Sequence, residues 1–107
     1  MKQDLQLKSR VKEILKIVQQ VSPGNSVELR IPPFSAIQCV SGSVHRRGTP
    51  PNVVEMTAVT LLELVCNPNH WDKFCHAGRI LASGTNANLK DLFIKVSKLD
   101  SGTRQGM

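Results

Sequence analysis

Four side chains that could ligate a metal lie within residues 66–76: Cys66, His70, Cys75 and His76. Structural zinc sites usually take their ligands in closely spaced pairs, such as C-x2-C or H-x3-H, and this segment lacks such pairs. Cys75 continues the apolar side of a predicted short helix, and the next residue, His76, points away from that side. Buried thiols that act as small apolar side chains explain these cysteines better. We therefore expect no metal and no other cofactor.

Nucleophilic catalysis is also a weak interpretation of the cysteines and histidines. Cys75 and His76 are adjacent in a helix, and adjacent helical residues do not face each other. Cys39 and His45 could approach across a predicted hairpin, but the sequence indicates no third group that would orient the base. The carboxylates occupy positions typical of a solvent-facing surface, and no glycine-rich phosphate loop occurs. We expect that the protein is not an enzyme.

The most distinctive polar segment is His45-Arg46-Arg47-Gly48-Thr49-Pro50-Pro51-Asn52. Guanidinium groups match carboxylates and phosphates, so this segment could hold an anionic head group. Adjacent residues of a strand point to opposite faces, so only one of Arg46 and Arg47 would face a given site. The alternative is an exposed hairpin end that leaves through a rigid Pro-Pro pair.

Lys8, Lys12 and Lys16 form a stripe at helical spacing, in a chain whose formal net charge is +6. Such a stripe could bind an acidic protein partner or the phosphate groups of a nucleic acid. The alternative is an ordinary solvated helix face, and Glu13 and Asp4 dilute the field there. Aromatic residues make up only 4% of the chain and tyrosine is absent, which weakens base stacking. A basic interaction module is therefore the second hypothesis, with nucleic acid an unlikely partner and the identity of any protein partner unknown from the sequence.

Length and composition favour one folded domain. The chain has 107 residues, 40% of them hydrophobic, enough for a single core but not for two. No apolar run approaches the roughly 20 residues of a membrane span, and the first residues lack the apolar part of a signal peptide. Three cysteines do not form a disulfide framework. These features predict a soluble, cytoplasmic protein.

The first half of the chain predicts one helix followed by strands. A helix of about 17 residues buries one apolar stripe and ends at Ser22-Pro23-Gly24-Asn25. Period-two alternation then predicts a strand over Val27–Ile31, which Pro32-Pro33 ends. Further strands are expected near residues 36–40 and 53–56, and residues 44–47 could be a returning strand. The helix stripe consists of Leu7, Val11, Ile14, Val18 and Val21.

The second half predicts three helices and one strand. Thr57 caps the first helix, and Asn69 with Asp72 resembles a capping box for a short second helix that ends near Gly78. A strand covers residues 79–82, and Asn86 caps the last helix. The fold class is therefore α+β, with a mostly antiparallel sheet of about four to five strands covered on one face by helices. Residues 1–97 would form this single domain, and residues 98–107 a flexible C-terminal tail.

The apolar helix faces suggest a possible ligand site between the layers. A sheet covered on one side by short helices can enclose a tunnel that an apolar molecule fills. The alternative is that the same side chains fill the core completely. The candidate lining residues are Leu61, Leu62, Val65, Trp71, Phe74, Ile80, Leu89, Leu92 and Phe93.

Several segments resemble the bacterial sterol-carrier-protein orthologue family. They comprise Val27 to Phe34, Ala36 to Val40, His45 to Glu55, Trp71, Ala77 to Ile80, and Ala82 to Gly84 before Asn88-Leu89. The run Arg-Gly-Thr-Pro-Pro-Asn-Val-Val-Glu is the most specific part, and the resemblance extends from about Arg10 to Val96. It implies a sterol-carrier-like α+β fold and a non-catalytic protein that binds or carries an apolar lipid or acyl ligand. Arg46 or Arg47 would then hold the head group.

Overall fold

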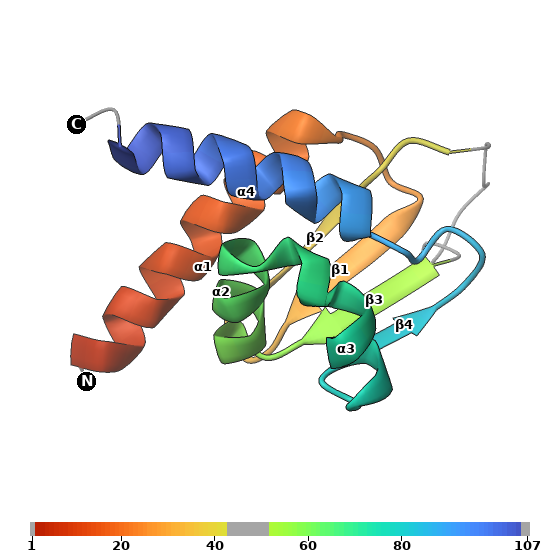
Figure 1. Ribbon diagram of the computed structural model, residues 1–107, viewed down its shortest axis with the longest axis horizontal. Helices are drawn as coiled ribbons and strands as arrows, with labels where there is room; N and C mark the ends of the chain where they lie inside the picture. Colours follow the sequence, from red (N-terminus) through yellow and green to blue (C-terminus); the bar gives the residue numbers. More distant parts are fainter. Residues whose placement is uncertain (1, 43–51, 106–107) are drawn as a thin grey trace.

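The order of helices and strands follows the changes in apolar periodicity along the chain (Figure 1). The computed structural model describes residues 2–42 and 52–105. Both the α+β class and the alternation of segments agree with the prediction. The elements are α1 (Lys2–Val21), β1 (Val27–Ile31), β2 (Ser35–Cys39), β3 (Asn52–Met56), α2 (Ala58–Cys66), the 3-10 helix η1 (Pro68–His70), α3 (Trp71–His76), β4 (Ile80–Ser83) and α4 (Lys90–Gln105).

The four described strands form a mixed sheet in the order β2-β1-β3-β4. β1 pairs antiparallel with β2 and parallel with β3, and β3 pairs antiparallel with β4. The expected sheet is thus confirmed, with the addition that its two central strands are parallel. The possible strand over residues 44–47 lies outside the described residues.

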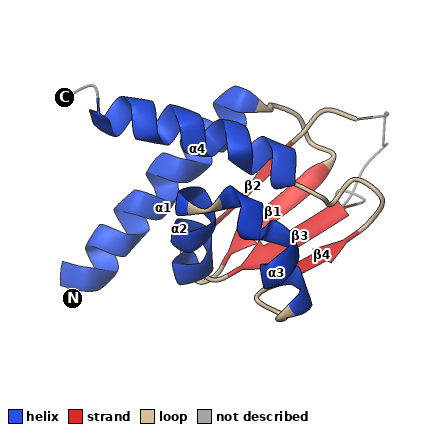
Figure 2. Ribbon diagram, viewed as in Figure 1, coloured by secondary structure: helices blue, strands red, loops and turns tan. Residues whose placement is uncertain are grey.

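The helices pack on one face of this sheet (Figure 2). In β1, Val27, Leu29 and Ile31 are fully buried, whereas Glu28 and Arg30 point to the opposite, open face. The buried strand residues belong to the same apolar cluster as those of α1, α2, α3 and α4. This alternation is what a sheet covered on one side requires.

The helix ends follow the predicted signals in part. The Thr57 side chain accepts a hydrogen bond from the Thr60 N–H, as expected of an N-cap. Gly78, with φ +74°, ends α3, and the adjacent Arg79 N–H donates to the Phe74 carbonyl. The capping box at Asn69 and Asp72 is not formed, because Pro68–His70 make a 3-10 turn that leads directly into α3.

The C-terminal helix differs most from the prediction. The Asn88 side chain, not that of Asn86, accepts a hydrogen bond from the Lys90 N–H at its start. The helix then continues to Gln105, through most of the segment that composition assigned to a flexible tail. Arg10 of α1 donates to both carboxylate oxygens of Asp100, at 2.8 and 2.6 Å. This ion pair between distant residues holds the last turns of α4 and leaves no local pattern in the sequence.

Candidate functional site

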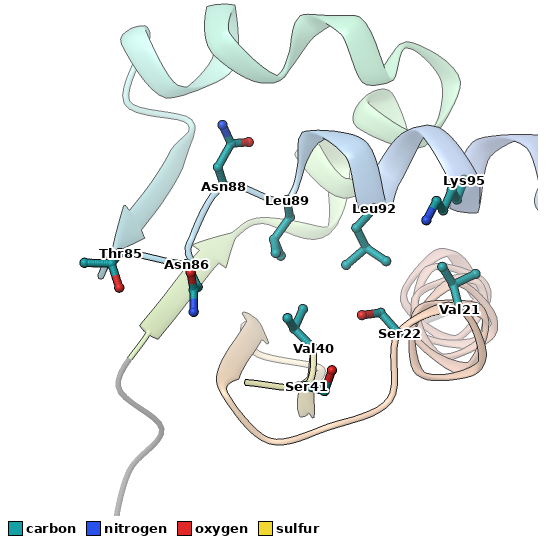
Figure 3. A pocket seen from close by; sticks show the side chains of 10 residues that line it. All are labelled: Val21, Ser22, Val40, Ser41, Thr85, Asn86, Asn88, Leu89, Leu92 and Lys95. Atoms are coloured by element: carbon teal, nitrogen blue, oxygen red, sulfur yellow. The ribbon is translucent and has the colours of Figure 1, made fainter. Parts of the chain in front are cut away.

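A pocket of about 430 Å³ lies between the end of α1, the end of β2 and the start of α4 (Figure 3). Its volume is within the range of small-molecule sites, at the lower end. The pocket opens to solvent, and side chains from three separate parts of the chain surround it. They are Val21, Ser22, Val40, Ser41, Thr85, Asn86, Asn88, Leu89, Leu92 and Lys95.

The apolar wall of this pocket comes mainly from the start of α4 and the residue before it. Leu92 of α4 and Leu89, which directly precedes this helix, extend towards Val40, the residue after β2 (Figure 3). Leu89 is 2% exposed and Leu92 is 9% exposed, so both also belong to the core. The pocket therefore borders the apolar core at Leu89 and Leu92, whereas six of its ten lining residues are polar or charged.

Asn52 fixes the opposite side of the pocket. It is 2% exposed, and its Nδ2 donates to the Ser26 carbonyl at 2.8 Å, while its Oδ1 accepts from the Asn86 N–H at 2.9 Å. Gly84 passes so close that a Cβ there would collide with the Asn52 side chain. One buried amide thus joins the start of β1, the start of β3 and the turn that enters α4.

Val40 has an unusual backbone conformation at the pocket. Its φ is +64°, a value that β-branched residues rarely adopt. Its N–H donates to the Ser22 carbonyl at 2.8 Å, and its carbonyl accepts from the Ser26 N–H at 3.0 Å and from the Ser26 hydroxyl at 2.8 Å. These three hydrogen bonds over-determine the conformation and point the valine side chain at Leu89.

Most of the predicted lining residues lie in the core. Leu61, Val65, Trp71, Phe74 and Phe93 are between 0% and 5% exposed, and none of them lines the pocket. The Trp71 and Phe93 rings stack with centroids 6.3 Å apart. The interior between the sheet and the helices is therefore packed by these side chains in the described part of the chain.

Four predicted residues border open space, at three different places. Leu89 and Leu92 line the pocket described above. Ile80 borders a depression of about 460 Å³ beside the edge strand β4. Leu62 borders another, of about 380 Å³, together with Leu7 and Arg10. In the described part of the chain, the nine residues predicted to line one tunnel are thus divided between the core and these three depressions. Arg46 and Arg47 lie outside the described residues.

The residues that sequence reasoning missed come from turns and element ends. Ser22, Ser41 and Asn86 lie outside any periodic apolar pattern, so no helix or strand signal selects them. Asn52 belongs to the distinctive polar run and directly precedes the predicted strand near residues 53–56, but its burial is visible only in the structure. Lys95 lies three residues after Leu92, which places it at the rim of the same helix face.

The other groups tested for chemistry lie apart. Burial raises the pKa of the Cys39 thiol to about 11, whereas Cys66 is exposed at the end of α2. Within residues 2–42 and 52–105, no group of three or more His, Cys, Asp or Glu side chains could hold a metal ion. Lys8, Lys12 and Lys16 are all exposed along α1. No helix in the described part of the chain is long and apolar enough to span a membrane.

The comparison with protein families gives one match, which covers most of the chain. The family described as bacterial SCP ortholog matches residues 3–94, which include all four described strands and the first turn of α4. A search of curated proteins found no match. The match starts earlier than the resemblance noted from the residues, because it includes nearly all of α1. The chain therefore belongs to the bacterial SCP ortholog family.

Proposed function

We propose that this protein is a non-catalytic carrier-like domain that binds a small apolar lipid or acyl ligand in the pocket between α1, β2 and α4. The observation that carries the proposal is the opening of apolar core side chains, Leu89 and Leu92, onto a pocket of about 430 Å³. Burial of ligand methylenes against such a wall is favourable by about 0.8 kcal/mol each. Membership of the family supports a lipid-carrier-like role.

The proposed ligand site is the pocket and not the interior of the α/β sandwich. The interior is occupied by Trp71, Phe93 and their neighbours, and a ligand would have to displace closely packed side chains. The pocket needs no such displacement, because it is already open.

A cytoplasmic location is part of the proposal. Cys39, Cys66 and Cys75 are all free thiols. Free thiols are the usual state of cysteine in a reducing compartment.

Ligand titration of the delipidated protein tests the proposal. A fluorescent fatty acid should bind saturably with a micromolar dissociation constant. Ser41→Trp places a large ring in the pocket from an exposed position and should weaken binding at least tenfold. Leu99→Trp is the matched control, because Leu99 is 50% exposed on α4, the helix that borders the pocket, but does not line the pocket itself.

Two results would contradict the proposal. If the delipidated wild-type protein binds no fatty acid, the carrier-like function is wrong. If Ser41→Trp binds as tightly as Leu99→Trp, the ligand does not occupy this pocket. Circular dichroism of each variant checks that the fold is retained.

A further inference from the structure

The pocket contains one charged side chain among its ten lining residues. That residue is Lys95, and no aspartate or glutamate lines the pocket. Lys95 forms no ion pair with any residue in the described part of the chain, in contrast to Lys90, whose amine lies 3.5 Å from Asp72. Figure 3 shows the Lys95 amine on the side of the pocket formed by Val21 and Ser22. The charge at this end is therefore positive and available to a ligand.

Polarity is also distributed unevenly along the pocket. Leu89, Leu92 and Lys95 are spaced by three residues along α4 and the residue before it, so successive side chains rotate gradually from the core towards solvent. Their burial follows this rotation, since Leu89 and Leu92 are buried and Lys95 is exposed. Beyond Leu89, the wall changes to the polar side chains of Thr85, Asn86 and Asn88 (Figure 3). The apolar middle thus lies between a cationic end and an uncharged polar end.

The helix geometry sets the length of the apolar middle. The axial rise from Leu89 to Lys95 is about 9 Å, at roughly 1.5 Å per residue. A chain that begins at Lys95 would therefore reach the amide-lined end after a medium-length alkyl segment. Any further methylenes would lie against polar side chains or in solvent and gain little from burial.

We infer that the pocket selects a medium-chain amphiphile whose compact anionic group lies at Lys95 and whose alkyl segment lies on Leu92, Leu89 and Val40. This inference rests on the proposed function and adds the ligand's charge and chain length to it. Ser22 lies beside Val21 on the Lys95 side of the pocket (Figure 3), and its hydroxyl group can donate to an anion's oxygen. A carboxylate and a phosphate monoester share this chemistry.

Calorimetric titration of the delipidated protein with matched ligands tests both parts. Hexanoate, octanoate, decanoate, dodecanoate and palmitate vary the chain length, while octanol and octyl phosphate vary the head group. Affinity should rise with chain length to octanoate or decanoate and then level off. Octanoate should bind about three- to tenfold more tightly than octanol, and this advantage should shrink as salt concentration rises. Octyl phosphate that binds more tightly than octanoate would support a phosphate monoester as the natural head group.

Variants of Lys95 identify the source of the charge preference. Lys95→Met should remove the advantage of octanoate over octanol with little effect on octanol, and Lys95→Arg should keep the advantage. Lys98→Met is the matched control, because Lys98 is exposed on α4 and does not line the pocket. It should behave as the wild-type protein does.

The outcomes separate this inference from the proposed function. Equal binding of octanoate and octanol to the wild-type protein would overturn the charge preference and leave the carrier-like function intact. Affinity that keeps rising through palmitate would overturn the length limit. If no ligand of the series binds, nor the fluorescent fatty acid, the function itself is wrong.

Discussion

Substitution of Asn52 should destabilise the protein far more than its small side chain suggests. In Asn52→Ala both amide hydrogen bonds are lost, the one donated to Ser26 and the one accepted from Asn86. Each is worth about 1 kcal/mol net. Ser26 is only 2% exposed, so its carbonyl loses a partner that water does not readily replace, at a further cost of about 1 kcal/mol. Asn86 is exposed, and water can accept from its N–H. The sum is a loss of about 3 kcal/mol.

Urea unfolding measures this loss directly. Trp71 is the single tryptophan and is 3% exposed, so its fluorescence reports exposure of the core. For a slope of about 1.5 kcal/mol per molar urea, the midpoint should fall by about 2 M. Asn88→Ala is the matched control, because it removes one exposed cap and should cost about 1 kcal/mol or less.

Asn52→Asp tests which half of the amide matters. Its carboxylate still accepts from Asn86, but it would face the Ser26 carbonyl with an acceptor where the wild type has a donor. The folded state therefore raises the pKa of this carboxyl, and the variant loses stability relative to the wild type as pH rises above about 4. A loss below about 0.5 kcal/mol for Asn52→Ala, or a pH-independent difference for Asn52→Asp, would refute the reasoning.

Three further predictions concern other parts of the fold. Arg10→Ala removes both hydrogen bonds to Asp100 and should lower the free energy of unfolding by about 2 kcal/mol. Amide hydrogen exchange should become faster at the end of α4 in this variant, and unchanged exchange there would contradict the stabilising role of the ion pair. Burial raises the pKa of Cys39 from 9.0 to about 11, so ionisation favours the unfolded state as pH rises from 9 to 11. The wild type should lose stability over that range relative to Cys39→Ala, and native iodoacetamide labelling should modify Cys66 before Cys39. The triple variant Lys8→Gln, Lys12→Gln and Lys16→Gln should bind fatty acid as the wild type does; salt-sensitive binding of DNA or RNA by the wild type, lost in the triple variant, would favour the basic interaction module instead.

Local sequence patterns predicted the elements better than their arrangement. Alternation over Val27–Ile31 matches β1, and Thr57 marks the start of α2, because both signals depend on near neighbours. The parallel pairing of β1 with β3 leaves no such trace, since it joins residues far apart in the chain. The end of α4 was missed for the same reason, because Arg10 and Asp100 stabilise it from opposite ends of the chain.

The candidate site was predicted only in part for a related physical reason. Leu89 and Leu92 were found through helical periodicity, which identifies apolar faces. Periodicity does not distinguish a side chain that borders open space from one that fills the core, as Phe93 does. The difference depends on what lies opposite each side chain, because Trp71 stacks on Phe93 whereas the pocket separates Leu89 from Val40.

The central position of β1 also affects where this fold can accept an added residue. Cys39 at the end of β2 and Asn52 at the start of β3 both pair with Val27, on its two sides. The ends of the connection between them are thus held about 10 Å apart, two strand spacings, whatever its length. Each doubling of a loop costs only about 0.6 kcal/mol in closure entropy. We expect an added residue in this connection to cost little stability, whereas an insertion in the short turn between Ile31 and Ser35 would shift the register of β2.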